Sequence, residues 1–242
     1  MRMIRKAPRY AQDWVAHVRQ RRRMLKFYPR FIRRGDLCFD IGANVGRTTE
    51  VFLALGARVI CVEPEASSLR RLRERFGHDK NVVLVDNALG DHEGEGELAV
   101  CEGASTISTM SEKWKTQGRF AKESEWTRTQ RVPITTLDTL VLRYGCPAFC
   151  KIDVEGFEEP ALRGMTKPIP CLSFEFSKEF LGEARKCVDH LLSIGRAEFN
   201  CALGETMRFV FPTWVTSGEL HAKLESMRDD LLWGDIYAKF LT

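Results

Sequence analysis

A carboxylate, two glycines and an amide lie within a few positions of one another in the stretch 37–49, which reads LCFDIGANVGRTT. Gly42 and Gly46 allow the backbone to turn sharply and to approach a ligand closely. Free N–H groups at the start of the helix that follows favour an anionic group such as a carboxylate or a phosphate. The stretch therefore predicts a strand ending at Asp40, a nucleotide-binding turn that contains Asn44, and a helix.

A second carboxylate, Glu63, ends the apolar run 58–63, one helix further along the chain. This is the position at which an acidic side chain holds a ribose diol in nucleotide-binding α/β proteins. The loop departs from the dinucleotide fingerprint, because Asp40 precedes the first glycine by two residues and Asn44 replaces the second glycine. These differences argue against an NAD-dependent dehydrogenase, an alternative that a cofactor-binding assay tests.

Asn87 and Ala88 follow a third predicted strand, 81–86. In this architecture the residue just past that strand faces an adenine edge, where an amide both donates and accepts hydrogen bonds. A simple turn is the alternative function of Asn87.

Two further carboxylates, Asp153 and Glu155, follow the apolar run that begins at 148, and Glu175 lies near the end of the run 171–176. In open α/β sheets the ligand site lies beyond the carboxyl ends of the strands. We therefore expect Asp153 and Glu155 beside the group to be transferred. The alternative is structural, with Asp153 fixing the loop and Glu155 capping a helix that begins near Phe157.

The remaining periodicity alternates strands with helices and predicts an α/β fold. Expected helices cover 8–28, 48–55, 67–76, 137–142, 184–194 and 217–227, and expected strands include 97–101, 132–135, a hairpin of 199–201 with 207–211, and 233–240. Which C-terminal strand runs antiparallel is left open. Residues 103–130 lose their period, which is typical of an acceptor-binding lid or of a surface loop.

Charge divides the 242 residues unevenly, although the net charge is only +4. Residues 1–34 hold twelve of the 37 basic residues and one acid, leaving 25 basic and 32 acidic residues elsewhere. We expect a basic N-terminal helical extension (1–34) and a single domain (35–242). No apolar run reaches the length of a membrane span and the N-terminus lacks a secretion signal, so we expect a cytoplasmic protein. The cysteines in predicted strands are expected to be buried free thiols.

The basic extension presents Tyr10, Trp14 and Val18 at helical spacing, and Pro29 is expected to end the helix. It either contacts anionic headgroups or nucleic acid, or packs its aromatic side on the sheet or on a second subunit. We expect it to serve solubility, assembly or surface attachment, so its deletion should leave turnover nearly intact.

Together these motifs resemble those of FkbM-family methyltransferases, a branch of the class I S-adenosylmethionine-dependent enzymes. The resemblance rests on FDIGANVG (39–46), VEP (62–64), NALGD (87–91), TLD (136–138) and KIDVEG (151–156). It implies a Rossmann-like fold with a mostly parallel seven-stranded sheet and helices on both faces. It also implies S-adenosylmethionine as cofactor, and O-methylation of a hydroxyl on a sugar, glycan or other small metabolite.

Carried across by position, the resemblance implies a role for each motif. The cofactor-binding residues would be Asp40 near the ammonium, Gly42, Asn44 and Gly46 along the methionine end, Glu63 at the ribose, and Asn87 with Ala88 at the adenine. Asp153 or Glu155 would be the base or would hold the acceptor. We expect no metal ion; the alternative is Mg²⁺ bound by Asp138, Asp153, Glu155 and Glu175.

Two other functions stay open, namely a nucleic-acid methyltransferase that binds phosphates through the basic extension and a non-catalytic cofactor-binding module. The expected partner is a small-molecule or glycan acceptor. A homo-oligomer and a peripheral membrane contact are also considered, whereas nucleic acid is not favoured.

Overall fold

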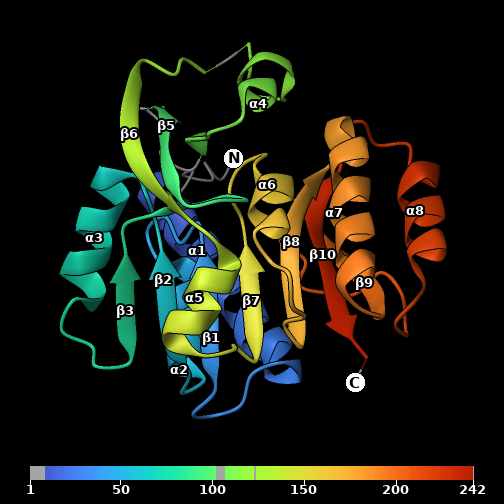
Figure 1. Cartoon of the computed structure of the whole chain (residues 1–242), viewed down its shortest axis with the longest axis horizontal. Helices are drawn as coiled ribbons and strands as arrows, with labels where there is room; N and C mark the ends of the chain where they lie inside the picture. The colour runs from blue at the N-terminus through green and yellow to red at the C-terminus, as the bar shows by residue number, and fades with distance from the viewer. Residues whose placement is uncertain (1–8, 102–106, 123, 242) are drawn as a thin grey trace, which may run out of the picture.

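A computed structural model describes residues 9–101, 107–122 and 124–241 of the chain. Its main sheet has seven strands in the order β3-β2-β1-β7-β8-β10-β9 (Figure 1). The strands are β1 (Leu37–Ile41), β2 (Arg58–Val62), β3 (Val82–Val85), β7 (Phe149–Ile152), β8 (Cys171–Ser177), β9 (Ala197–Leu203) and β10 (Trp233–Phe240). From β3 to β8 all neighbours pair in parallel, whereas β10 is antiparallel to both β8 and β9. The predicted mostly parallel sheet is thus confirmed, and β10 is the antiparallel strand.

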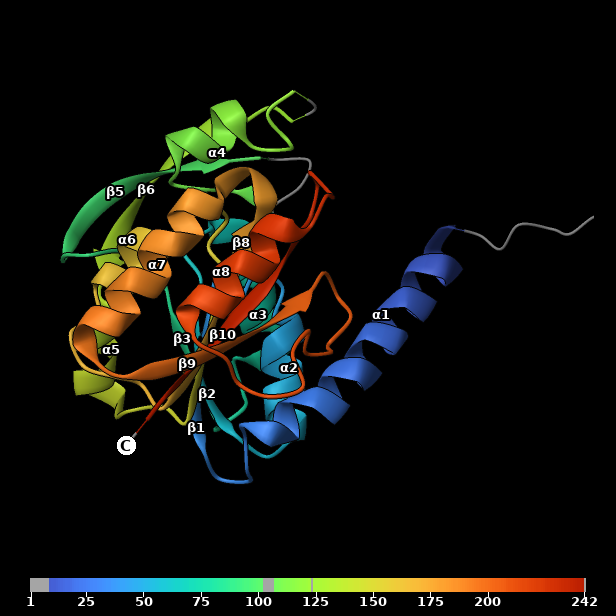
Figure 2. The same cartoon turned by 90° about the vertical axis from the view of Figure 1, so that its right-hand side faces the viewer.

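Helices cover both faces of this sheet, as Figure 2 shows edge-on. Along β1, Cys38 faces one side and Phe39 and Ile41 face the other, because side chains alternate along a strand. One core lies under α1 (Arg9–Phe27), α2 (Arg47–Ala54) and α3 (Ala66–Phe76). The opposite core lies under α5 (Leu137–Tyr144), α6 (Glu158–Arg163), α7 (Leu181–Ile194) and α8 (Ser217–Ser226). Burial on both faces explains why the central strands read as continuous apolar runs.

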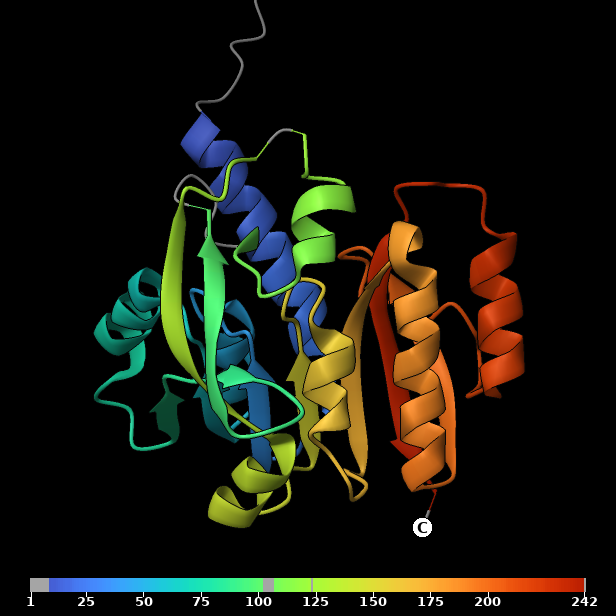
Figure 3. The same cartoon turned by 45° about the horizontal axis from the view of Figure 1, so that its top comes forward.

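A second, three-stranded sheet lies above the carboxyl ends of the central strands (Figures 1 and 3). It consists of β4 (Ala88–Leu89), β6 (Arg128–Thr135) and β5 (Gly94–Val100), and the short helix α4 (Glu112–Gln117) lies beside it. The predicted strands 97–101 and 132–135 were too short. The outer parts of β5 and β6 alternate little in polarity, because neither face of those segments is well buried.

The C-terminal hairpin also differs from expectation. Strand β9 pairs with β10 over its whole length, whereas residues 207–211 contribute a single bridge, Ala202 to Phe209. The side chain of Asn200 donates to the Phe211 and Thr213 carbonyl groups, both at 3.0 Å. The Asn200 side chain therefore holds residues 211–213 against β9, where a regular hairpin would have a ladder of backbone hydrogen bonds.

Helix α1 begins away from the body and packs on it through its C-terminal end (Figure 2). The Phe27 ring lies 5.1 Å from that of Phe209 and 5.4 Å from that of Tyr237, centroid to centroid. Trp14, from the predicted aromatic stripe, is 66% exposed. The helix ends two residues before Pro29, and a 3-10 turn, Tyr28–Arg30, follows it. The end of the basic extension is therefore part of the core. None of the described helices is long and apolar enough to span a bilayer.

This packing predicts unequal effects of two truncations in the same helix. Phe27→Ala should lower the free energy of unfolding by roughly 3–5 kcal/mol, because the ring is 2% exposed and its removal leaves a cavity. Trp14→Ala should change it by no more than about 0.5 kcal/mol, because that ring lies mostly in solvent. Urea unfolding measures both. Equal costs would contradict this docking of α1.

Candidate active site

Four strands of the main sheet carry acidic side chains at or just beyond their carboxyl ends. They are Asp40 on β1, Glu63 after β2, Asp153 after β7 and Glu175 on β8. One cavity of about 450 Å³ is lined by all four, a size suited to a small-molecule ligand. The sheet thus brings together the carboxylates that the sequence predicted along one edge. Gln20 and Met24 of α1 also line this cavity, although no sequence motif predicts that this helix reaches the site.

The glycine loop after β1 closely follows the backbone of its neighbours. Gly42 has φ +75° and donates from its N–H to the Val62 carbonyl at 2.9 Å. A side-chain carbon at Gly42 would overlap the Asp153 carbonyl oxygen, and one at Gly46 would overlap the Phe76 ring. Gly46, with φ +78°, precedes the first turn of α2. Both glycines are therefore required by the local geometry, as predicted. Gly42 lines the cavity, and Gly46 lies in the chain between the lining residues Val45 and Arg47.

Asp40 and Asn44 both line the cavity. Thr49 donates from Oγ1 to Asp40 Oδ2 at 2.5 Å, and burial raises the pKa of the Asp40 carboxyl above its ordinary value. Asn44 adopts φ +50°, and its buried Oδ1 has no hydrogen-bond partner among the described residues. An unpaired hydrogen-bond acceptor in the glycine loop suits a ligand that carries a hydrogen-bond donor, such as an ammonium group.

Glu63 is held by two backbone N–H groups, from Asn44 at 2.7 Å and from Glu65 at 2.8 Å. These bonds tie the acid after β2 to the glycine loop after β1. The two N–H donors lower the pKa of the Glu63 carboxyl, but burial outweighs them and raises this pKa to about 7. Asn87 and Ala88 line the same cavity; Asn87 lies between β3 and β4, and Ala88 begins β4. All the predicted cofactor-binding residues except Gly46 thus line one cavity.

Three carboxylates of this cavity lie close together. Asp153, Glu155 and Glu175 each place an oxygen within 4.8 Å of the other two. Burial, then the charges of Asp153 and Glu158, raise the pKa of Glu155 well above its ordinary value. Burial, then Asp153 and Glu155, do the same for the pKa of Glu175. Such a group cannot carry three negative charges at neutral pH without a counter-charge, so it holds protons readily.

Lys151 supplies one counter-charge. Its Nζ donates to Asp153 Oδ2 at 2.6 Å, and the lysine is 8% exposed. Burial acts to lower the pKa of Lys151, but the charges of Asp153 and Asp235 outweigh it and raise that pKa, so the amine stays protonated. Sequence reasoning did not single out Lys151 as a site residue. The signal was available, because a lysine inside an otherwise apolar buried strand needs a carboxylate partner.

Another acid holds the helix start that was considered for Glu155, and Asp138 of the Mg²⁺ alternative has a different partner. Glu158, rather than Glu155, accepts from the N–H groups of Val154 and Gly156 and so holds the start of α6. Asp138, which the Mg²⁺ alternative included, instead accepts from the N–H and hydroxyl groups of Thr166. The sheet therefore brings together three of the four acids of that set.

The mostly parallel sheet covered on both faces, the glycine loop and the row of strand-end acids define a class I S-adenosylmethionine-dependent methyltransferase. The chain belongs to the FkbM family, because the family model for the methyltransferase FkbM domain matches residues 40–194. The predicted family, fold and cofactor are confirmed. No curated protein matches the sequence.

Several solved structures resemble the chain at low identity. A precorrin-6y C5,15-methyltransferase from Geobacter metallireducens is 13% identical, with 91% of this chain and 87% of that chain covered and a TM-score of 0.47. A putative RNA methyltransferase from Pyrococcus horikoshii is 10% identical, with 93% and 84% covered and a TM-score of 0.45. A putative methyltransferase from Streptococcus mutans in complex with SAH is also 10% identical, with 90% and 95% covered and a TM-score of 0.42.

Glu63 predicts a pH-dependent affinity for S-adenosylhomocysteine. The ionised carboxylate accepts hydrogen bonds from ribose hydroxyl groups more strongly than the protonated form does. Binding should therefore tighten as pH rises through about 7. Without ligand, the folded state retains a proton that the unfolded state releases above the ordinary pKa of 4.5, so protein stability should fall as pH rises from 4.5 to about 7. Glu63→Gln should abolish both trends and weaken binding about 10- to 150-fold at pH 8.

Calorimetry from pH 6 to 8 measures the affinity for S-adenosylhomocysteine, with the exposed Glu74→Gln as control. An unchanged dissociation constant would remove Glu63 from the site.

Proposed function

We propose that this methyltransferase transfers the methyl group to a hydroxyl oxygen on a sugar, glycan or other small metabolite. The observation that carries the proposal is the cluster of Asp153, Glu155 and Glu175, which lies in the same cavity as the glycine loop and Glu63. A hydroxyl acceptor must lose its proton during transfer, and the cluster offers two carboxylates, Glu155 and Glu175, whose pKa values burial and neighbouring negative charges raise well above their ordinary value.

Each residue has a separate task in this proposal. Glu63 and Asn87 hold the ribose and adenine ends of the cofactor, and the Asn44 amide oxygen accepts a hydrogen bond from its ammonium group. When bound, S-adenosylmethionine supplies an activated methyl group. Glu155 accepts the hydroxyl proton, while Asp153, fixed by Lys151 at 2.6 Å, orients the acceptor. Catalysis then rests on alignment and on one proton transfer.

The charge of the cavity supports a small neutral acceptor over a nucleic acid. Among the described residues, its lining holds seven acidic residues, among them Asp40, Glu63 and the Asp153 cluster, against three basic residues, Arg47, Arg119 and Lys151. This excess of acids disfavours phosphate groups. A nucleic-acid acceptor would depend on the basic extension and predicts a steep loss of affinity with added salt.

The test has two stages. Calorimetry should detect binding of S-adenosylmethionine and S-adenosylhomocysteine but not of NAD. Incubation of the protein and labelled S-adenosylmethionine with glycan and metabolite extracts, followed by mass spectrometry, should identify O-methylated products. Methylation confined to nucleic acid, or cofactor binding with no turnover on any extract, would contradict the proposal.

A further inference from the structure

A second cavity of about 300 Å³ adjoins the first on the side of α4, α6 and α7. Five residues line both cavities: Met110, Trp114, Phe157, Glu175 and Ser177. Glu175 therefore connects the carboxylate cluster to this second space. A molecule whose reacting hydroxyl lies at the cluster has room to extend from there into the second cavity.

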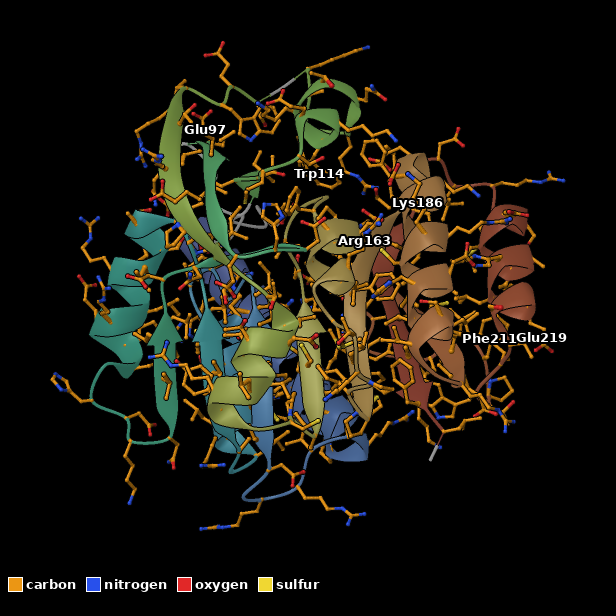
Figure 4. All side chains as sticks on the ribbon, in the orientation of Figure 1. Glu97, Trp114, Arg163, Lys186, Phe211 and Glu219 are labelled. Atoms are coloured by element: carbon orange, nitrogen blue, oxygen red, sulfur yellow. The ribbon has the colours of Figure 1, made fainter. Side chains whose placement is uncertain are left out.

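Trp114 is the main wall between the two spaces. It extends from α4 toward the loop before α6, where Gly156 leaves room for the indole ring (Figure 4). Its ring centroid is 5.8 Å from that of Phe180, at an interplanar angle of 41°. The indole is 5% exposed, yet its Nε1–H has no hydrogen-bond partner in the described part of the chain. A buried donor of this kind carries a desolvation cost that a ligand oxygen would relieve.

The charges in this cavity restrict what can bind. The wall carboxylates Glu158, Glu159 and Glu183 are already engaged, by backbone N–H groups or by basic side chains. Lys113, the basic residue of this lining, is itself paired with Glu183 at 2.6 Å. An anionic group would meet several carboxylates and no unpaired cation among the described lining residues. Aromatic faces together with a donor at Trp114 and an acceptor at Glu175 instead suit a ring with an apolar face and hydroxyl edges.

We propose that the second cavity is a subsite for an uncharged or amino-bearing sugar ring next to the ring that is methylated, so that the acceptor is at least a disaccharide. This inference rests on the proposed function and deepens it. Trp114 Nε1 donates to an oxygen of the second ring, Glu175 accepts from one of its hydroxyl or amino groups, and the ring face packs against Phe180.

The test compares binding of matched pairs, because binding does not depend on turnover. Methyl hexosides and the corresponding methyl disaccharides of the glucose, galactose, mannose and N-acetylglucosamine series are titrated into the protein saturated with S-adenosylhomocysteine. At least one disaccharide should bind about tenfold or more tightly than its monosaccharide. Ala184→Leu places a larger side chain into the second cavity and should bring this ratio close to one. Gly182→Leu on the same helix meets open space and should retain the wild-type ratio.

The outcomes separate this inference from the proposed function. Disaccharide binding that Ala184→Leu abolishes, without O-methylation of any sugar, glycan or metabolite extract, would support the subsite and overturn the proposed function. Methylation of monosaccharides without a disaccharide gain, or a gain that Ala184→Leu leaves intact, would overturn the subsite alone. If Ala184→Leu fails to fold, Trp114→Phe decides, because it keeps a ring and removes the N–H. A ratio lowered at least about threefold supports the subsite, and an unchanged ratio overturns it.

Discussion

Replacing Glu155 by glutamine should lower the turnover number about 10²- to 10⁴-fold while the affinity for S-adenosylhomocysteine stays at its wild-type value. Glutamine retains the shape of the side chain and removes its capacity to accept a proton. The loss would therefore fall on the transition state and not on cofactor binding. The exposed Glu97→Gln, labelled in Figure 4, is the matched control and should leave both quantities unchanged.

The pH profile sharpens this test. Burial, Asp153 and Glu158 raise the pKa of Glu155 well above 4.5, so the active, deprotonated base accumulates only as pH rises, and the rate should rise with it. Glu155→Gln should remove this rising limb. Glu175→Gln should shift the limb to lower pH, because it removes a neighbouring negative charge that favours protonation of Glu155.

Two results would contradict the base role. Normal activity of the folded fraction together with a lower melting temperature would make Glu155 a structural residue. Loss of wild-type activity in EDTA with recovery in Mg²⁺ would assign the three carboxylates to a cation instead, because carboxylate oxygens are ligands for that ion.

Gly42→Ala should abolish cofactor binding and destabilise the fold by roughly 2–5 kcal/mol. About 1–2 kcal/mol comes from the left-handed backbone conformation, with φ +75°. A further 1–3 kcal/mol or so comes from overlap with the Asp153 carbonyl oxygen, a backbone atom that cannot move aside alone. Urea unfolding and calorimetry measure the two effects.

Gly35→Ala is the matched control for this change. Gly35 has φ +90°, but a side-chain carbon there would meet nothing within 4 Å. It should therefore show only the conformational cost of about 1–2 kcal/mol and keep cofactor affinity. Equal effects of the two substitutions would mean that the contact between the glycine loop and Asp153 contributes little.

The central strands and their terminal acids were predictable because each strand is buried on both faces and bounded by polar turns. Asp40, Glu63, Asp153 and Glu175 then follow from one rule about parallel sheets. Asp138 was grouped with these acids by residue type alone, and the structure places it at Thr166 because it lies at a helix start and not at a strand end.

Features set by distant contacts were not predictable from local pattern. Helix α1 carries large aromatic side chains near both of its ends. That Phe27 is buried and Trp14 is exposed depends on Phe209 and Tyr237, which lie far away in the sequence. The role of Trp114 likewise depends on Gly156, which leaves the space that the indole occupies. Amphipathicity identifies a helix but does not identify the surface that covers it.

The contact between Phe27 and Tyr237 also has a consequence during synthesis on the ribosome. Tyr237 is made 210 residues after Phe27, a delay of roughly 10–40 s at about 5–20 residues per second. Strand β10 must also insert between β8 and β9, which have both been made before it. Until then the nascent chain exposes the aromatic end of α1 and an unpaired edge of β8. We therefore expect the nascent chain to depend on ribosome-associated chaperones more than α/β proteins whose strands pair in order of synthesis.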